Sequence, residues 1–179
     1  MDSAHTGPLL FDTSAESWIN AAERERVPSW VRKYLNHFPV HVSAVTIMER
    51  VRGYELLWNG SDAERRAKVE YMRKRYFDEV RRVWPIDAGT AVAAGTISAM
   101  LPVPPSSPRR SHRLAESKQS RLARWQNDIV IAATAIVAGL PLVHNNAIDF
   151  EAIRAAVESA PERLPGFGPL VLIRCNWLM

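Results

Sequence analysis

The stretch NDIVIAATAIVAGLPLVHNNAIDF at residues 127–150 decides the fold of this chain. Its first half is apolar at nearly every position, and Gly139 with Pro141 ends that pattern. Small alanines inside the apolar part allow a helix to approach a sheet closely. The stretch predicts a buried helix from about Trp125 to Ala138, a short strand at 142–143, a polar loop at 144–149 and a helix at 150–159.

The rest of the chain continues this alternation of strands and helices. Leu9 to Phe11 form a continuous apolar run, which is typical of a strand covered on both faces. Further strands are predicted at 40–44, 83–86 and 170–174. Helices are predicted after the cap-like residues at 12–14, from Pro28, at 46–58, at 62–80 and from Asp87 to Met100. Such alternation favours an α/β fold with a parallel sheet between helices.

Three acidic residues far apart in the sequence lie beside apolar runs that we predict to be buried. They are Asp12, Glu49 and Asp128. An isolated carboxylate is costly to bury, so three of them next to the core of one small domain indicate convergence on a cation. Carboxylate oxygens suit a hard divalent metal ion. The sequence therefore predicts a metal-dependent hydrolase.

Length and composition fit one domain over residues 1–179, because 47% hydrophobic residues supply a sizeable core. Cys175 is the single cysteine, which excludes an intramolecular disulfide and fits a reducing compartment. The first residues lack a basic segment followed by a long apolar one. The apolar stretch at 129–143 is too short and interrupted to span a bilayer. We expect a cytoplasmic protein that makes no membrane contact.

The net positive charge of the chain comes from one segment. The chain has a formal net charge of +4, but six cations face only Glu116 between Pro102 and Asn127. Prolines and serines mark a loop at about 102–122. We interpret this basic loop as a contact for a polyanion, with a solvated disordered insert as the alternative. Its cations are Arg109, Arg110, Arg113, Lys118, Arg121 and Arg124.

Three segments together resemble the PIN-domain family of metal-dependent ribonucleases, and most closely its VapC-like toxins. They are LLFDTS at 9–14, VSAVTIMERVRGYEL at 42–56 and the 127–150 stretch. Their order and spacing agree with the family across nearly the whole chain. The resemblance implies a three-layer PIN-like fold, in which a mostly parallel sheet of four to five strands lies between helices.

The resemblance also implies a site and a reaction. Asp12, Glu49 and Asp128 would hold Mg²⁺ or Mn²⁺ for hydrolysis of RNA phosphodiester bonds. Many members carry a fourth acid where this chain has Asn146, which offers a carbonyl oxygen but no charge. Asp149 either compensates as a fifth catalytic residue or caps the helix beginning at Phe150.

Several polar residues near these acids have two interpretations. Thr13, Ser43 and Thr46 either orient carboxylates or cap helices. Asn127 either lines the site or caps its helix, and we predict the cap. His144 in the polar loop either touches a phosphate or is incidental.

The main prediction for function is the endoribonuclease toxin of a type II toxin–antitoxin pair, forming a homodimer and bound by a small antitoxin. The resemblance implies these partners. It also makes RNA the polyanion whose backbone we expect the basic loop to contact, with an antitoxin contact or a chain-specific elaboration as alternatives. An alternative is a catalytically idle PIN-like module that binds RNA or protein, for which the neutral Asn146 is the best support. A second alternative is an aspartyl-phosphate phosphatase built on Asp12. It needs a second Asp two residues later, where this chain has Ser14.

Overall fold

The predicted parallel sheet is confirmed by the computed structural model, which describes residues 7–20, 29–78, 81–108, 110–111 and 114–175. Five strands form one sheet, and every neighbouring pair in it is parallel. In spatial order the strands are β3 (Arg81–Trp84), β2 (Val40–Ser43), β1 (Leu10–Phe11), β6 (Leu142–His144) and β7 (Leu172–Arg174).

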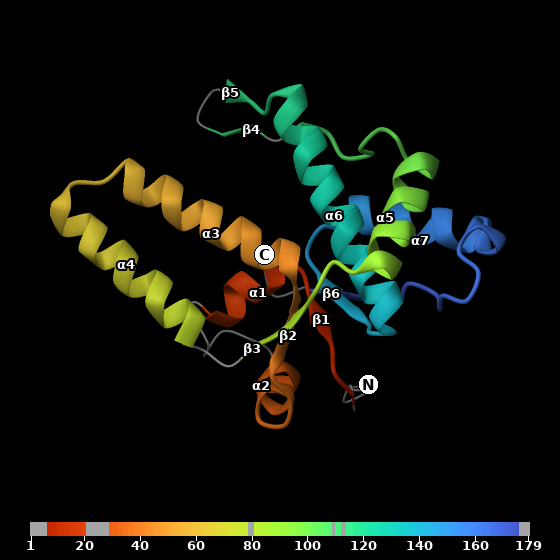
Figure 1. The fold of residues 1–179 in the computed structure, drawn as a ribbon, viewed down its shortest axis with the longest axis horizontal. Coiled ribbons are helices and arrows are strands. Elements are labelled where there is room, and N and C mark those ends of the chain that lie inside the picture. Colours follow the sequence, from red (N-terminus) through yellow and green to blue (C-terminus); the bar gives the residue numbers. More distant parts are fainter. Residues whose placement is uncertain (1–6, 21–28, 79–80, 109, 112–113, 176–179) are drawn as a thin grey trace.

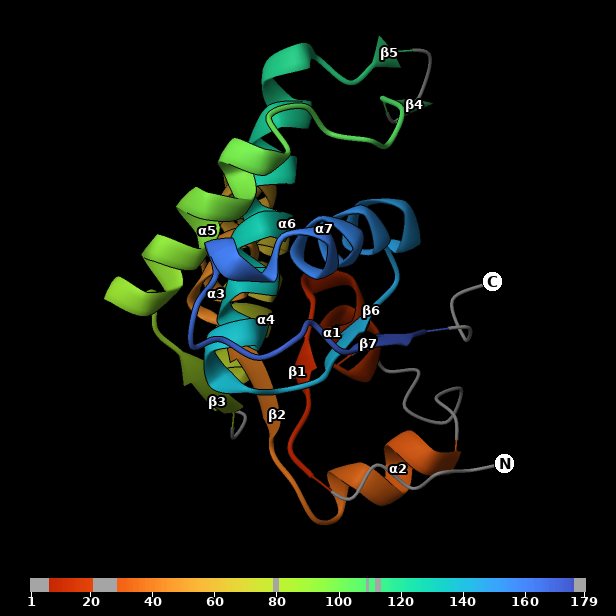
Figure 2. The same ribbon diagram turned by 90° about the vertical axis from the view of Figure 1, so that its right-hand side faces the viewer.

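Helices cover both faces of this sheet, so the three-layer α/β prediction is also confirmed. Consecutive residues of β1 point to opposite faces: Leu10 joins a core formed with α5, α6 and α7, whereas Phe11 joins a core formed with α1 and α2. The helices α5, α6 and α7 lie together in both views (Figure 1, Figure 2). The helices are α1 (Thr13–Asn20), α2 (Ser29–Leu35), α3 (Ala44–Asn59), α4 (Ala63–Asp78), α5 (Ala88–Met100), α6 (Lys118–Ala138) and α7 (Ala147–Ser159), followed by the short 3₁₀ helix η2 (Pro161–Arg163).

The basic segment is more regular than predicted. Two short strands, β4 (Arg110–Ser111) and β5 (Leu114–Ala115), pair in antiparallel fashion. Helix α6 then begins at Lys118, so the prediction that it begins near Trp125 was wrong. Its cap is Ser117, whose Oγ accepts a hydrogen bond from the Ser120 amide at 3.1 Å. The first two turns of α6 are largely exposed and polar, so hydrophobic periodicity did not reveal them.

Two other boundaries bear on the site. Helix α7 begins at Ala147, so Asp149 lies inside its first turn, which rules out the alternative that it caps a helix starting at Phe150. Helix α6 ends, as predicted, at Gly139, which has a φ of +64°. Among the helices of the described ranges, none is long and apolar enough to cross a lipid bilayer.

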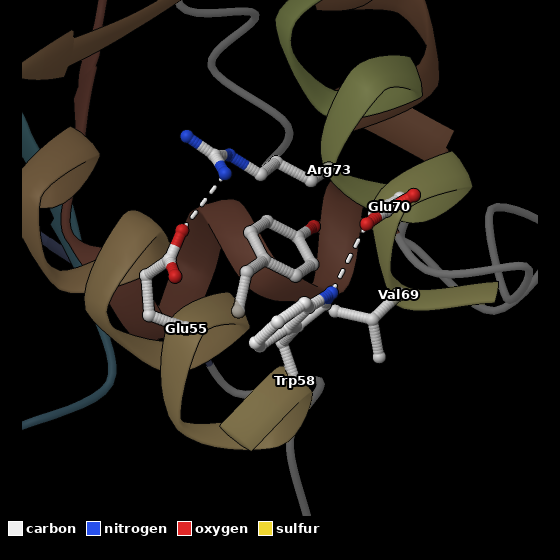
Figure 3. Close-up of a pocket in the computed structure, with 6 residues that line it drawn as sticks. Glu55, Trp58, Val69, Glu70 and Arg73 are labelled. Atoms are coloured by element: carbon white, nitrogen blue, oxygen red, sulfur yellow. Dashed lines mark hydrogen bonds and ion pairs between the residues drawn. The ribbon is translucent and has the colours of Figure 1, made fainter. Parts of the chain in front are cut away.

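The helices α3 and α4 form an antiparallel pair that extends away from the sheet (Figure 1). A pocket of about 220 Å³ lies on this pair (Figure 3). Arg73 Nη1 donates to Glu55 Oε1 at 2.8 Å, and Trp58 Nε1 donates to Glu70 Oε1 at 3.0 Å. The groups that line this pocket are thus already paired across the two helices, and none of them is a predicted site residue.

Candidate functional site

The three predicted acids come from different elements that meet at the carboxyl ends of the central strands. Asp12 follows β1, Glu49 lies in α3 and Asp128 lies in α6. The loop between β6 and α7, which carries Asn146, leaves the same edge of the sheet because β1 and β6 are parallel neighbours. In such sheets, ligands bind outside the carboxyl ends of the strands.

Asp12 is almost fully buried, with 3% of its surface exposed. Its Oδ1 accepts a hydrogen bond from the Ala15 amide at 2.6 Å, and its Oδ2 accepts one from the Asn145 amide at 3.4 Å. Burial, together with the nearby charge of Glu49, raises the pKa of Asp12 to about 6. Asp12 therefore caps α1 and still belongs to a group of mutually repelling carboxylates.

Glu49 is held by two neutral side chains. Thr13 Oγ1 donates to Glu49 Oε2, and Asn127 Nδ2 donates to Glu49 Oε1 at 2.7 Å. Thr13 also contacts Thr46, with 3.3 Å between their hydroxyl oxygens. Asn127 lies well inside α6, so the prediction that it caps this helix was wrong and it lines the site instead. The misplaced start of α6 in the sequence interpretation explains this error.

Asp128 lies at the centre of the acidic group. Burial raises the pKa of Asp128 to about 8, and the charges of Asp149, Asp12 and Glu49 raise it as well, while Arg124 lowers it. Asp149, Asp12 and Glu49 therefore each lie close enough to Asp128 to disfavour its charge. The convergence of Asp12, Glu49 and Asp128 on one metal ion stays a prediction.

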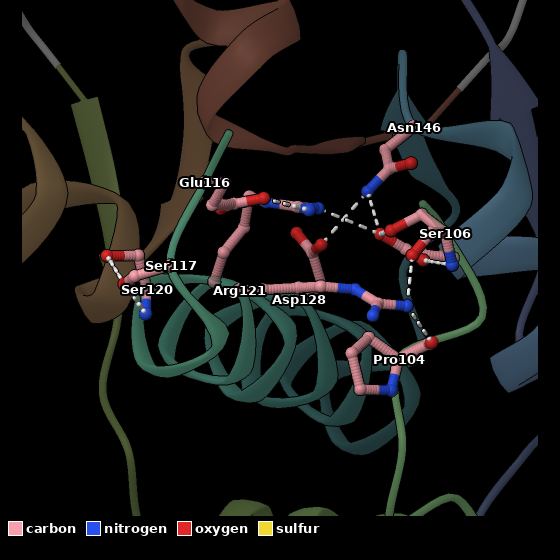
Figure 4. A network of polar contacts seen from close by, with 10 residues as sticks. Pro104, Ser106, Glu116, Ser117, Ser120, Arg121, Asp128 and Asn146 are labelled. Carbon is pink, nitrogen blue, oxygen red and sulfur yellow. Dashed lines mark hydrogen bonds and ion pairs between the residues drawn. The ribbon is translucent and has the colours of Figure 1, made fainter. Parts of the chain in front are cut away.

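Asn146 and Asp149 form part of a polar network beside Asp128 (Figure 4). The Asn146 Nδ2 donates to Asp128 Oδ2 at 3.0 Å and to Asp149 Oδ2 at 2.6 Å. Asp149 is fully buried and also accepts from the Ser106 amide at 3.1 Å, the Ser106 hydroxyl at 3.0 Å and Arg124 Nη1 at 3.1 Å. The sequence interpretation missed Ser106, which lies in a Pro/Ser-rich stretch without a distinctive pattern.

The cations of the basic segment differ in their partners and in their exposure to solvent. Arg121 Nη2 donates to the carbonyl oxygens of Pro104, at 2.7 Å, and Ser106. Arg124 pairs with both oxygens of Glu116, at 3.2 and 3.1 Å, in addition to Asp149. Both arginines thus bind groups of this chain, whereas Lys118 is exposed. Of the other predicted RNA contacts, Arg110 is described only by its place in β4, and Arg109 and Arg113 lie outside the described residues.

Two further polar residues of the sequence interpretation are buried. His144 has 0% of its surface exposed, and its ring centroid lies 5.1 Å from that of Phe150. Burial lowers the pKa of His144 to about 4, so the ring is neutral at pH 7. Ser43 caps α3 by accepting from the Val45 amide at 3.4 Å, and its Oγ lies 3.0 Å from Thr134 Oγ1. Neither side chain faces solvent.

The chemistry of the site fits a hard divalent cation. Its donors are carboxylate and amide oxygens, which Mg²⁺ and Mn²⁺ prefer, and bound positive charge would relieve the repulsion that raises the pKa values of Asp12 and Asp128. In this structure, the carboxylates of Glu49 and Asp128 accept hydrogen bonds from the side-chain amides of Asn127 and Asn146. Within the described ranges, no three Asp, Glu, His or Cys side chains are arranged as the ligands of one metal ion.

The raised pKa values predict how the stability of the metal-free protein depends on pH. Asp128, with a pKa of about 8 in the folded state, binds more protons than its unfolded counterpart, whose pKa is 3.8. Stability is then lost as the pH rises towards 8. Above pH 6.5 the opposing contribution of His144 adds only about 0.4 kcal/mol of stability, so we expect a net loss of about 1 kcal/mol between pH 6.5 and 8.

The measurement is urea unfolding in EDTA at the two pH values, repeated with Asp128→Asn as the control. The variant should show a flatter dependence, because it lacks the titrating group. Wild-type stability that rises over this interval would contradict the assignment of a buried, repelled carboxyl group at position 128.

The fold is an α/β fold with a parallel sheet, and it has acidic residues at the carboxyl ends of the strands. Comparison with known families identifies the family. The profile of the PIN domain matches residues 9–156. The chain belongs to the PIN-domain family. No curated protein gives a significant match.

A solved structure shares the fold, and two others are similar. The chain is similar to VapBC2 from Rickettsia felis bound to a promoter DNA fragment, with a TM-score of 0.56 and 13% identity over 95% of this chain and 100% of that one. It is also similar to VapBC-5 from Mycobacterium tuberculosis, with a TM-score of 0.49 and 20% identity over 94% and 98% of the two chains. For a toxin–antitoxin complex from Klebsiella pneumoniae the TM-score is 0.47, with 19% identity over 79% of this chain and 89% of that one.

Proposed function

We propose that this protein is a metal-dependent endoribonuclease that acts as the toxin of a type II toxin–antitoxin pair. The observation that carries the proposal is the convergence of Asp12, Glu49 and Asp128, with Asp149 beside them, at one edge of a PIN-domain sheet. The charged forms of Asp12 and Asp128, whose pKa values are raised by burial and by neighbouring acids, are costly to keep without a cation. Clusters of groups with shifted pKa values of this kind occur at functional sites.

The residues of the chain have distinct parts in this proposal. Asp12, Glu49, Asp128 and the Asn146 side chain supply oxygen atoms for Mg²⁺ or Mn²⁺. When bound, the ion supplies a water of lowered pKa and positive charge beside the phosphate. Thr13 and Asn127 hold the two Glu49 oxygens, so this carboxylate is oriented by neutral donors.

The basic segment supports an RNA substrate. Lys118 is exposed near the start of α6, and Arg110 lies in the β4–β5 hairpin that precedes this helix. Cations in such positions attract the phosphate backbone without reading the base sequence. Because Arg121 and Arg124 bind groups within the protein, we expect them to contribute less to RNA binding than the sequence interpretation assumed.

We also propose that residues 1–179 form one PIN-like domain, that it assembles as a homodimer, and that a small antitoxin protein silences it. The family match over 9–156 supports the single domain. The similar structure from Rickettsia felis is described as a VapBC pair, which supports the antitoxin.

A second candidate is a PIN-like module that binds RNA or protein without cleaving it. The observation in its favour is the neutral Asn146, whose amide nitrogen donates to two carboxylates. With one negative charge fewer, the site attracts a second metal ion less strongly. The two candidates differ in whether bound RNA is hydrolysed.

The test is cleavage of a mixed RNA pool by the purified protein with Mn²⁺, with Mg²⁺ and with EDTA. The nuclease proposal expects cleavage with either ion and none with EDTA or in Asp12→Asn. The matched control is Asp62→Asn, which makes the same chemical change at an exposed residue that caps α4. Equal cleavage by the wild type and Asp12→Asn would refute the proposal, and RNA binding without cleavage would favour the idle module.

A further inference from the structure

The carboxylate of Asp149 differs from those of Asp12 and Asp128 in how completely it is bound. Its two oxygens accept four hydrogen bonds, from Ser106 twice and from Arg124 and Asn146. The residue is fully buried, so solvent supplies no further partner. A carboxylate oxygen offers about two acceptor positions, and Oδ2 alone already accepts three bonds. Asp149 therefore has little capacity left for a metal ion.

Charge leads to the same conclusion. The Arg124 guanidinium lies 3.1 Å from Asp149 Oδ2 and is itself fixed by Glu116, whose two oxygens it contacts. A paired carboxylate attracts a cation less than a free one, because the arginine already neutralises part of its charge. Asp12, by contrast, accepts bonds only from backbone amides in the hydrogen bonds described above.

The geometry of Asn146 indicates what Asp149 does instead. The side-chain amide nitrogen of Asn146 has two hydrogens, and two carboxylates accept from it, those of Asp128 and Asp149. With the nitrogen held in this way, the carbonyl oxygen is the end of the amide left for another partner. An aspartate at position 146 would instead place an oxygen against two carboxylate oxygens.

The same carboxylate also holds the basic segment. Its bonds to the Ser106 amide and hydroxyl join residues 43 positions apart in the sequence. Arg121 reinforces this attachment by binding the carbonyl oxygens of Pro104 and Ser106 (Figure 4). The segment that leads into the β4–β5 hairpin is thus fixed beside the acidic site.

We propose that Asp149 is a positioning residue rather than a metal ligand: it orients the Asn146 amide and, together with Arg124, pins the Ser106 segment beside the site. The part that concerns the metal rests on the proposed function. Asn146 and Asp149 then act as one unit, in which the amide offers its oxygen to the ion and the acid fixes the amide.

The first test is a Mg²⁺ titration of the wild-type protein, followed by the NMR signals of the aspartate side-chain carboxyl carbons. The proposal expects the Asp12 and Asp128 signals to move, while the Asp149 signal stays within its linewidth. Movement of Asp149 together with Asp12 and Asp128 would overturn it. This titration needs no substitution, so it remains decisive if a variant fails to fold.

The second test is hydrogen exchange of the Ser106 backbone amide in the metal-free protein. Asp149→Ala removes both acceptors and should speed this exchange about tenfold, the value expected for loss of one ordinary hydrogen bond. The matched control, Asp62→Ala, removes a capping carboxylate from exposed α4 and should leave Ser106 unchanged. Unchanged exchange in Asp149→Ala would overturn the pinning of the segment.

The two tests separate this inference from the proposed nuclease. If Mg²⁺ moves none of the carboxyl signals, the proposed metal chemistry fails, and the Ser106 exchange alone supports or overturns the pinning. If the wild type binds Mg²⁺ and cleaves RNA while Asp149 moves with the other acids, the nuclease stands and the positioning role is refuted.

Discussion

Asp128→Asn is expected to abolish metal-dependent RNA cleavage and, in the same protein, to stabilise the metal-free fold. The variant removes the carboxylate nearest the centre of the acidic group, so cleavage should fall by more than about 100-fold. In the wild type, burial and the neighbouring acids disfavour the charge of Asp128 and raise its pKa to about 8. The variant removes this charge. At pH 8 the metal-free variant should gain on the order of 2 kcal/mol in its free energy of unfolding.

The opposite signs of the two effects make this prediction informative. Replacing a residue that serves only the fold lowers the stability of the protein. Replacing a functional acid that destabilises the fold raises it. The measurements are cleavage with Mn²⁺ and urea unfolding in EDTA, with Asp62→Asn as the control for the same chemical change. Loss of both activity and stability in Asp128→Asn would show that position 128 is structural.

The strands and the acids were predictable because their signals are local and strong. Leu10 and Phe11 are apolar on both faces of β1, which a covered central strand requires, and Asp12 directly follows them. Ser43 and Gly139 mark the ends of helices by their ordinary chemistry. The parallel alternation then brings the strand ends to one edge, so the site followed from the order of the elements.

The contacts around Asp149 were not predictable in the same way. They depend on Ser106, 43 residues away, and on an arginine whose partners a sequence does not specify. The first turns of α6 are exposed, so nothing in their hydrophobic pattern distinguished them from the loop before them. As a result Arg124 was interpreted as a surface cation, although it is mostly buried between Glu116 and Asp149. Long-range pairing of polar side chains is settled by tertiary packing, which local patterns do not encode.

The buried ion pair between Glu16 and Arg50 is expected to give the largest stability effect outside the acidic site. Glu16 has 0% of its side chain exposed, and Arg50 donates to its Oε2 through Nε at 2.7 Å and through Nη2. The Arg50 guanidinium carbon also lies 5.6 Å from the centroid of the Tyr76 ring. Arg50→Met should cost about 3 kcal/mol, because it removes the guanidinium that donates two hydrogen bonds to a buried carboxylate.

The matched control is Arg52→Met, which removes the same charge and shape from an exposed position of the same helix. It should change the free energy of urea unfolding by no more than about 0.5 kcal/mol. Adding Glu16→Gln to Arg50→Met should restore much of the loss, because the double variant no longer buries the Glu16 charge. Equal losses in Arg50→Met and Arg52→Met would show that the pair contributes little. The pair joins α1 to α3, the helices that carry Thr13 and Glu49, so its loss should also loosen the hydrogen bond that orients the Glu49 carboxylate.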